Sequence, residues 1–158
     1  MARMTGQWQT AGAKIEFIGK NLTPKATEAM REAGEELAEI MRNHVRNQDL
    51  SWKPLAPSTV QQKGSNLIYI DTGDLLANGF KVRALRGKQK GAKFFVGANV
   101  WTKHKPSGLK MSDVMTYLEY GTDKIPPRPL IRPSVEEFKT DFPKKFSKYM
   151  NVELGKGG

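Results

Sequence analysis

The stretch from Pro24 to Asn47 constrains the fold more than any other part of the chain, because it has the pattern of one long amphipathic helix. Thr23 can cap this helix, and Pro24 stands at the first helical position, where no backbone N–H is needed. Apolar side chains recur at helical spacing and form one stripe: Ala26, Met30, Ala33, Leu37, Ile40, Met41 and Val45. Such a stripe has to be buried against another layer of structure.

A second amphipathic helix is predicted near the C-terminal end. It starts between Leu130 and Ser134, and Ser134 with Glu137 fits a capping box. Its apolar face consists of Val135, Phe138, Phe142, Phe146 and Met150. Because Pro143 lies inside this pattern, we expect a kink near Lys139 or two shorter helices.

Strand patterns lie between these two helices. Apolar and basic residues alternate from Phe80 to Leu85, and Lys93 to Val100 reads as a second strand. The turn Gly87–Gly91 joins them, so the pattern predicts a β-hairpin with a basic tip. Short helices are expected after Ser58, near Asp71 and Asp74, and from Ser112 to Tyr120, the first ended by Gly64 and the last by Gly121.

Two proline-rich stretches cannot be helical and are predicted to be extended arms. The first runs from Trp52 to Pro57, and the second from Ile125 to Pro133 contains four prolines.

The predicted fold class is therefore α+β, in which a long N-terminal helix and a C-terminal helix pack on a small antiparallel β-sheet that contains a long basic hairpin. A length of 158 residues suits a single domain. We expect an N-terminal arm at residues 1–22, one α+β domain at 23–150, and a flexible, glycine-rich tail at 151–158.

The net charge of +10 is concentrated in one segment. Residues 77–110 carry nine basic side chains and no acidic one. A field of one sign attracts polyanions or acidic protein surfaces, although a merely solvated loop system has the same composition. The residues expected to face DNA or an acidic partner are those of the hairpin: Lys81, Arg83, Arg86, Lys88, Lys90 and Lys93.

The sequence contains no pattern typical of catalysis. It has no cysteine and only two histidines, and it lacks a nucleophile elbow or a zinc-binding His-Glu-x-x-His pair. Asp71 and Asp74 are interpreted as helix caps, and Glu119 as a carboxylate with a structural partner such as Arg128 or Arg132. We therefore expect no enzyme, no metal and no cofactor. The first residues lack the apolar core of a signal peptide, and no apolar run is long enough to span a bilayer, so we expect synthesis in a cytoplasm and no membrane partner.

Several segments in order resemble a known family. The acidic helix is followed by Trp52-x-Pro54-Leu55-x-Pro57-Ser58-Thr59, and then by Asp71-Thr72-Gly73-x-Leu75. After the hairpin come Tyr117-x-Glu119-Tyr120-Gly121-Thr122 and Ile125-Pro126-Pro127-Arg128-Pro129-x-x-Arg132-Pro133. This order is similar to that of the tail-component and virion-morphogenesis family of tailed bacteriophages, which comprises neck or tail-completion proteins.

The resemblance implies a non-catalytic structural protein of the virion neck or tail, present in the host cytoplasm during assembly. It implies a homo-oligomeric ring around the DNA channel. The implied protein neighbours are a head-completion (stopper) or adaptor protein, a tail terminator and possibly tail-tube protein. Genomic double-stranded DNA would pass through the channel and be contacted without sequence specificity. The alternative is a stand-alone basic nucleic-acid-binding module without catalysis. In the assembly hypothesis the two proline-rich arms are docking surfaces; the alternative is that both stretches wrap their own domain. The docking residues are Trp52, Pro54, Leu55, Pro57, Tyr120, Arg128, Pro129, Arg132 and Pro133.

Overall fold

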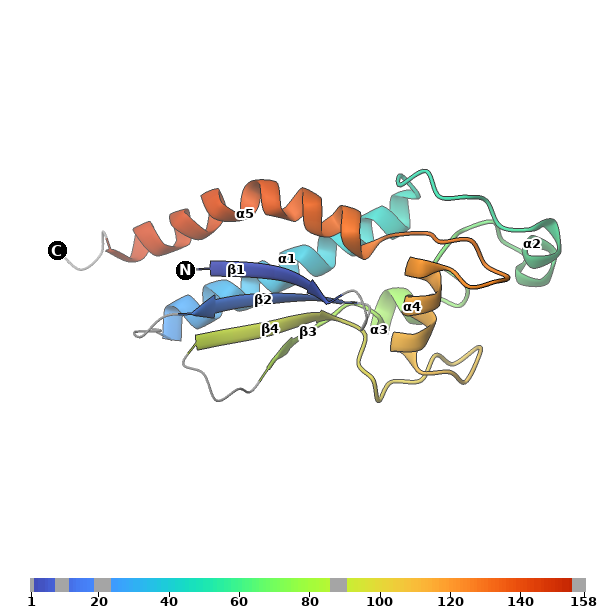
Figure 1. Ribbon diagram of the computed structural model, residues 1–158, viewed down its shortest axis with the longest axis horizontal. Helices are drawn as coiled ribbons and strands as arrows, with labels where there is room; N and C mark the ends of the chain where they lie inside the picture. Colours follow the sequence, from blue (N-terminus) through green and yellow to red (C-terminus); the bar gives the residue numbers. More distant parts are fainter. Residues whose placement is uncertain (1, 8–11, 19–23, 86–90, 155–158) are drawn as a thin grey trace.

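The computed structural model describes residues 2–7, 12–18, 24–85 and 91–154, and it has the α+β fold that the sequence predicts (Figure 1). The strands are β1 (Ala2–Gln7), β2 (Gly12–Ile18), β3 (Lys81–Ala84) and β4 (Gly91–Gly97). The helices are α1 (Pro24–Asn47), α2 (Pro57–Lys63), α3 (Asp74–Asn78), α4 (Met111–Tyr120) and α5 (Ile131–Leu154). The molecule is elongated: α2 lies at one end, and strands β3 and β4 extend toward the other end.

All four strands form one antiparallel sheet in the order β1-β2-β4-β3. The expected pairing of β3 with β4 is present, whereas the hairpin tip at residues 86–90 lies outside the described residues. The expectation of an N-terminal arm at residues 1–22 needs correction, because β1 and β2 belong to the sheet and β2 pairs with β4. The alternation of Ala13, Ile15 and Phe17 with charged residues is the strand signal that was overlooked.

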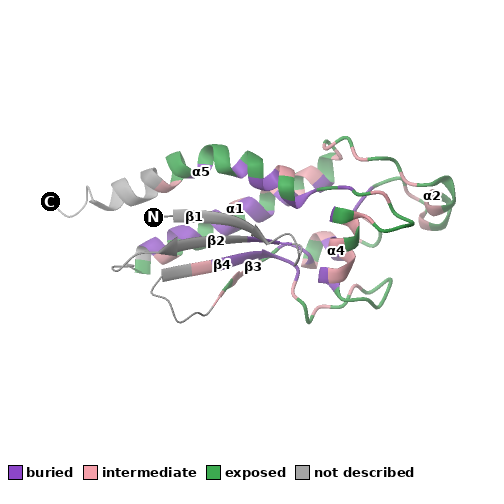
Figure 2. Cartoon of the chain, viewed as in Figure 1, coloured by how far each residue is buried: buried purple, intermediate pink, exposed green. Residues whose placement is uncertain are grey.

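Helices α1 and α5 pack against each other and against the same face of the sheet. The α1 stripe is buried as predicted: Met30, Leu37, Met41 and Val45 are fully inaccessible, and the buried residues in Figure 2 follow this layer. At Gly34 the helix approaches the sheet so closely that an added Cβ would lie 2.8 Å from Cγ1 of Val82. Glycine at this position is what permits the close contact between α1 and β3.

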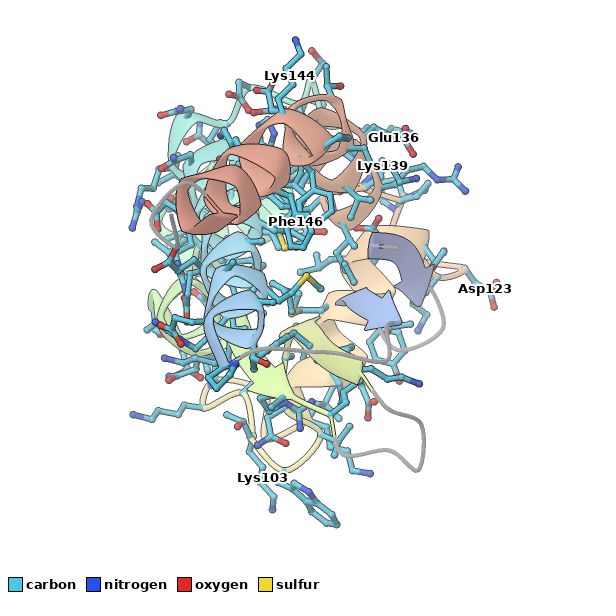
Figure 3. All side chains as sticks on the ribbon, turned by 90° about the vertical axis from the view of Figure 1, so that its left-hand side faces the viewer. Lys103, Asp123, Glu136, Lys139, Lys144 and Phe146 are labelled. Carbon is cyan, nitrogen blue, oxygen red and sulfur yellow. The ribbon has the colours of Figure 1, made fainter. Side chains whose placement is uncertain are left out.

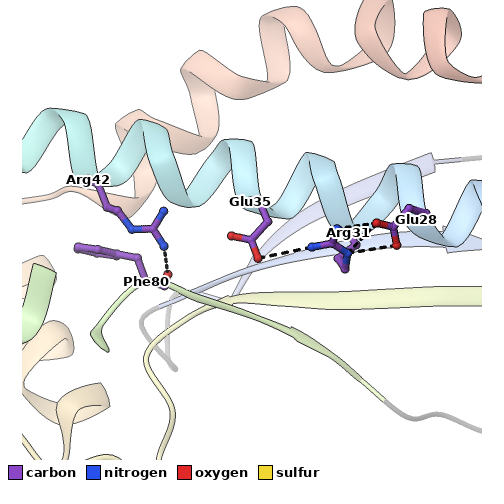
Figure 4. Close-up of polar contacts among 5 residues, drawn as sticks. All are labelled: Glu28, Arg31, Glu35, Arg42 and Phe80. Carbon is purple, nitrogen blue, oxygen red and sulfur yellow. Dashed lines mark hydrogen bonds and ion pairs between the residues drawn. The ribbon is translucent and has the colours of Figure 1, made fainter. Parts of the chain in front are cut away.

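Charged residues on α1 also anchor the start of β3. Nη2 of Arg42 donates to the backbone oxygen of Phe80 at 2.6 Å (Figure 4). Arg31, which is exposed, forms ion pairs with Glu28 and Glu35, each about one helical turn away along α1. These exposed pairs contribute little stability, whereas the Arg42 bond fixes the loop that leads into the hairpin.

Helix α5 is one continuous element that contains Pro143. The expectation of two shorter helices is therefore wrong, and the helix instead follows a curved course in Figure 1. Its inner face buries Phe138 and Phe142, and Phe146 points toward the core while Lys144 points outward (Figure 3). The expectation of a flexible tail at residues 151–158 needs correction for residues 151–154, which belong to α5, while residues 155–158 lie outside the described residues.

The short helices form where predicted, but with different caps. Ala56 and Lys110 occupy the N-cap positions of α2 and α4, and neither makes a side-chain hydrogen bond to its helix. The expected caps, Ser58 and Ser112, lie inside these helices and do not cap them. Gly64 and Gly121 end these helices with φ of 66° and 77°, as expected of C-terminal glycines.

Candidate functional site

The two proline-rich arms are joined to each other by hydrogen bonds. Nε1 of Trp52 donates to the backbone oxygen of Pro129 at 2.7 Å. In the opposite direction, Nε of Arg128 donates to the oxygen of Lys53 at 2.8 Å, and its Nη2 to that of Pro54 at 3.1 Å. Proline-rich segments have few backbone donors of their own, so side-chain donors hold their carbonyls. The arms thus form one rigid unit, called here the arm pair (residues 52–57 and 125–133).

Tyr69 lies under the arm pair and fixes it from below. Its hydroxyl donates to the backbone oxygen of Arg128 at 2.7 Å, and its ring lies 5.1 Å from that of Trp52. Burial raises the pKa of this hydroxyl well above its ordinary value, so it remains a donor. The residue has a φ of 64°, a left-handed conformation that is costly for a bulky side chain. The surrounding contacts therefore hold Tyr69 in a strained state.

A groove of about 410 Å³ opens between the arm pair, α2 and α4. Apolar side chains make up most of its wall: Leu55, Ile68, Ile70, Leu75, Val114, Leu118 and Ile125. The volume is in the range of a pocket that takes a large side chain or a small ligand. We call it the α2 groove.

The charged side chains that line the α2 groove are mostly basic. Lys53, Lys63, Lys124 and Arg128 line it together with a single carboxylate, Asp71. Nζ of Lys63 donates to the backbone oxygens of Leu67 at 2.8 Å and Ile70 at 2.6 Å, and burial lowers its pKa. Burial likewise lowers the pKa of Arg128.

A second hollow, of about 310 Å³, lies on the other side of the second arm. We call it the Tyr120 hollow, and it is lined by Glu119, Tyr120, Pro127, Pro129 and Arg132. Three predicted docking residues, Tyr120, Pro129 and Arg132, are thus brought together around one cavity, and all three are exposed. Tyr120 is 47% exposed, which leaves much of its ring accessible to a partner.

Glu119 fixes the wall of this hollow. Its carboxylate is buried and accepts three backbone N–H groups: those of Leu130 at 2.6 Å, Ile131 at 2.9 Å and Arg132 at 3.2 Å. These are the free donors at the start of α5, so Glu119 caps that helix from a distant part of the chain. Glu119 thus has the expected structural role, but its partners are backbone amides and not the side chain of Arg128 or Arg132. Ser134 donates to the oxygen of Leu130 and does not form the expected capping box.

The remaining docking residues of the arm pair differ in accessibility. Pro54 and Pro57 are exposed, whereas Trp52, Leu55 and Pro133 are half-buried. Arg128 is only 4% exposed, and its guanidinium is engaged with its own chain. The expectation that Arg128 is a docking residue is therefore corrected, because its guanidinium joins the two arms of its own chain.

The described basic residues of the hairpin, Lys81, Arg83 and Lys93, lie on the face of the sheet that points away from α1. Val82 contacts α1, so its strand neighbours Lys81 and Arg83 lie on the opposite face. Lys81 is exposed and Lys93 half-buried, while the guanidinium of Arg83 lies 5.0 Å from the ring centre of Phe95. Arg86, Lys88 and Lys90 lie outside the described residues.

Three features of the structure were not identified from the sequence. Asp74 accepts the backbone N–H of Lys105 at 2.9 Å and the side chain of Asn78, which lower its pKa. His44 lies between two carboxylates, with Nδ1 2.7 Å from Asp49 and Nε2 3.0 Å from Glu137. Trp101, in the loop after β4, is 84% exposed. The contacts of Asp74 with Lys105 and of His44 with Glu137 have no local sequence signal, because these partners are distant in sequence.

No protein-family model matches the chain, and searches of curated proteins and of solved structures return no match. Among the described residues, no three His, Cys, Asp or Glu side chains come together in a way that could hold a metal ion. None of the described helices is both long and apolar enough to cross a membrane.

Proposed function

We propose that this chain is a structural protein of a bacteriophage head–tail junction, a neck or tail-completion protein that forms a ring around the DNA channel and acts by docking, without catalysis. The proposal rests on the resemblance of the ordered sequence segments to that family. The observation that supports it most is the arm pair, because the segments that carry the resemblance converge into one rigid unit flanked by two hollows.

A rigid arm pair suits association between proteins. Its hydrogen bonds and prolines are already in place before binding, so little conformational entropy is lost on docking. Exposed groups at two separate hollows favour heterologous contacts, in which one patch meets a different patch, and such contacts close into rings. In this proposal the neighbours are further copies of the chain, a head-completion or adaptor protein and a tail terminator.

The basic hairpin adds a second surface for this function. It opens toward the end of the molecule opposite α2, so a subunit can dock at one end and present basic strands at the other (Figure 1). In a ring, these strands would face passing DNA and contact phosphates without sequence preference. Lys81, at the start of β3, is exposed on the sheet face that points away from α1, so it supports a basic sheet face; the residues of the hairpin tip lie outside the described ranges.

Size-exclusion chromatography with light scattering tests the docking function. The expected result is a ring, or a monomer that associates with the head-completion or tail-terminator protein. Tyr120→Ala should weaken this association. Tyr117→Ala is the matched control, since Tyr117 is 42% exposed on the same helix and lines neither hollow. If both variants associate as strongly as the parent protein does, docking at the Tyr120 hollow is contradicted.

The alternative, a stand-alone nucleic-acid-binding module, is favoured by the acid-free segment at residues 77–110. A monomer that binds DNA tightly and ignores both assembly partners would support it. Replacing Lys88, Lys90 and Lys93 by Gln should reduce DNA binding and its salt dependence if the hairpin contacts phosphates. The same replacement at Lys139, Lys144 and Lys145 on α5 removes equal charge and should have little effect on DNA binding.

A further inference from the structure

We infer that the α2 groove binds an extended acidic peptide segment of a partner protein, in which a bulky apolar side chain is flanked by carboxylates. This deepens the proposed function and rests on it, because it names the chemistry of one docking partner. It differs from the resemblance, which specifies neither this groove nor what enters it.

The wall of the groove selects a large apolar side chain. Leu55, Ile68 and Val114 are among the residues that line it, and the space of about 410 Å³ exceeds that of any one side chain. The groove does not need to be shaped by the ligand, because Arg128 and Trp52 hold its two edges together through the bonds to Pro54 and Pro129. A preformed apolar site of this kind gains affinity chiefly by burying an aromatic or branched side chain.

The rim of the groove selects negative charge. Four basic side chains and one carboxylate line it, which leaves a formal excess of three positive charges. Lys53 and Lys124 are exposed, so their ammonium groups are available to a ligand. The side-chain donors of Lys63 and Arg128 are instead bonded to carbonyls of the groove's own loops, and their charge acts through the field alone. Carboxylates on either side of the apolar anchor would complement this field.

The positive charge at the rim also makes a second copy of this chain a poor ligand for the α2 groove. Among the described residues its most exposed large apolar side chain is that of Trp101, but Lys103 and Lys105 follow within four positions and would meet a basic rim. The carboxylates of Glu28 and Glu39 on α1 are already paired with arginines of their own helix. Charge complementarity therefore points to a partner with a different sequence.

Selection from a random peptide display library on the intact chain tests this inference without a particle or a known partner. We expect the enriched peptides to share one aromatic or large aliphatic residue flanked by Asp or Glu. A synthetic, fluorescently labelled peptide of the enriched sequence then gives affinities by anisotropy, and these should fall as salt is raised.

Two variants locate the binding site. Thr59→Trp fills the groove from α2 and should weaken binding by at least about tenfold, whereas Ser58→Trp, on the same helix but outside the groove, should leave it within about twofold. Lys124→Glu reverses a rim charge and should weaken binding about three- to tenfold. Lys144→Glu makes the same change on the outer face of α5 and serves as its control (Figure 3). Circular dichroism establishes that each variant is folded.

The inference is overturned by enriched peptides that are basic or uncharged, by the absence of enrichment, or by affinities that Thr59→Trp and Lys124→Glu leave unchanged. DNA binding that is lost in Lys124→Glu, with no peptide enrichment, would assign the rim to nucleic acid and also overturn it. Failure here leaves the association of the chain with head and tail proteins untouched, because Tyr120→Ala tests that separately at the other hollow.

Discussion

Replacing Glu119 by Ala should destabilise the protein more than any other single carboxylate substitution in the described residues. The two shortest bonds to its carboxylate come from the buried amides of Leu130 and Ile131. Removing the acceptor leaves each amide unsatisfied at a cost of about 1–3 kcal/mol. The half-exposed third bond, from Arg132, and the lost charge at the start of α5 add about 1 kcal/mol. The expected loss is therefore about 3–7 kcal/mol.

Urea unfolding followed by circular dichroism measures this loss. With a slope of about 2 kcal/mol per molar urea, the midpoint of Glu119→Ala should fall by about 1.5–3.5 M. Glu119→Gln keeps one carbonyl acceptor at the same place and should lose only about 1–2 kcal/mol. Glu136→Ala, an exposed position on α5, the helix that Glu119 caps, should stay within about 0.5 kcal/mol of the parent. A loss below about 1 kcal/mol for Glu119→Ala, or equal losses for the Ala and Gln variants, would refute the assignment of Glu119 as the cap of α5.

Three further predictions concern the elements that position the site. Trp52→Phe keeps the ring but removes the donor to Pro129, and should lower the free energy of unfolding by about 1 kcal/mol in the same urea assay. Asp74→Asn should make the stability of the protein depend less on pH in the acid range. The pKa of Asp74 is lowered in the folded protein, so its ionised form stabilises the fold above about pH 4, and this contribution is lost as the pH falls further. Acid unfolding followed by circular dichroism measures the difference. Gly34→Val should destabilise by about 1–3 kcal/mol through the clash with Val82, and Val82→Ala in the same chain should recover part of the loss in thermal unfolding; no recovery would contradict the contact.

The long helices and the hairpin could be predicted because their patterns are local. The α1 stripe repeats over several turns, and the basic alternation from Phe80 marks β3. β1 has no clear alternation of apolar and polar residues and so gives little local signal, whereas β2 does alternate over residues 13–17 and could have been predicted. The continuity of α5 through Pro143 reflects tertiary packing of its phenylalanine face, which outweighs the local cost of the proline.

The candidate site was predictable in composition but not in geometry. The prolines marked both arms, and Tyr120, Pro129 and Arg132 do line one hollow. That Arg128 is buried was not predictable, because its acceptors lie more than seventy residues earlier in the chain. The α2 groove is likewise built from segments that are distant in sequence, so no local motif indicates it.

The most direct test of the central claim, that the chain works by docking at a head–tail junction, is electron microscopy of particles made when its gene is disrupted in the phage or prophage that encodes it. The account predicts DNA-filled heads and separate tails that fail to join, restored by the parent chain but less well by Tyr120→Ala. Intact, infectious particles whose necks form normally without the chain would contradict it.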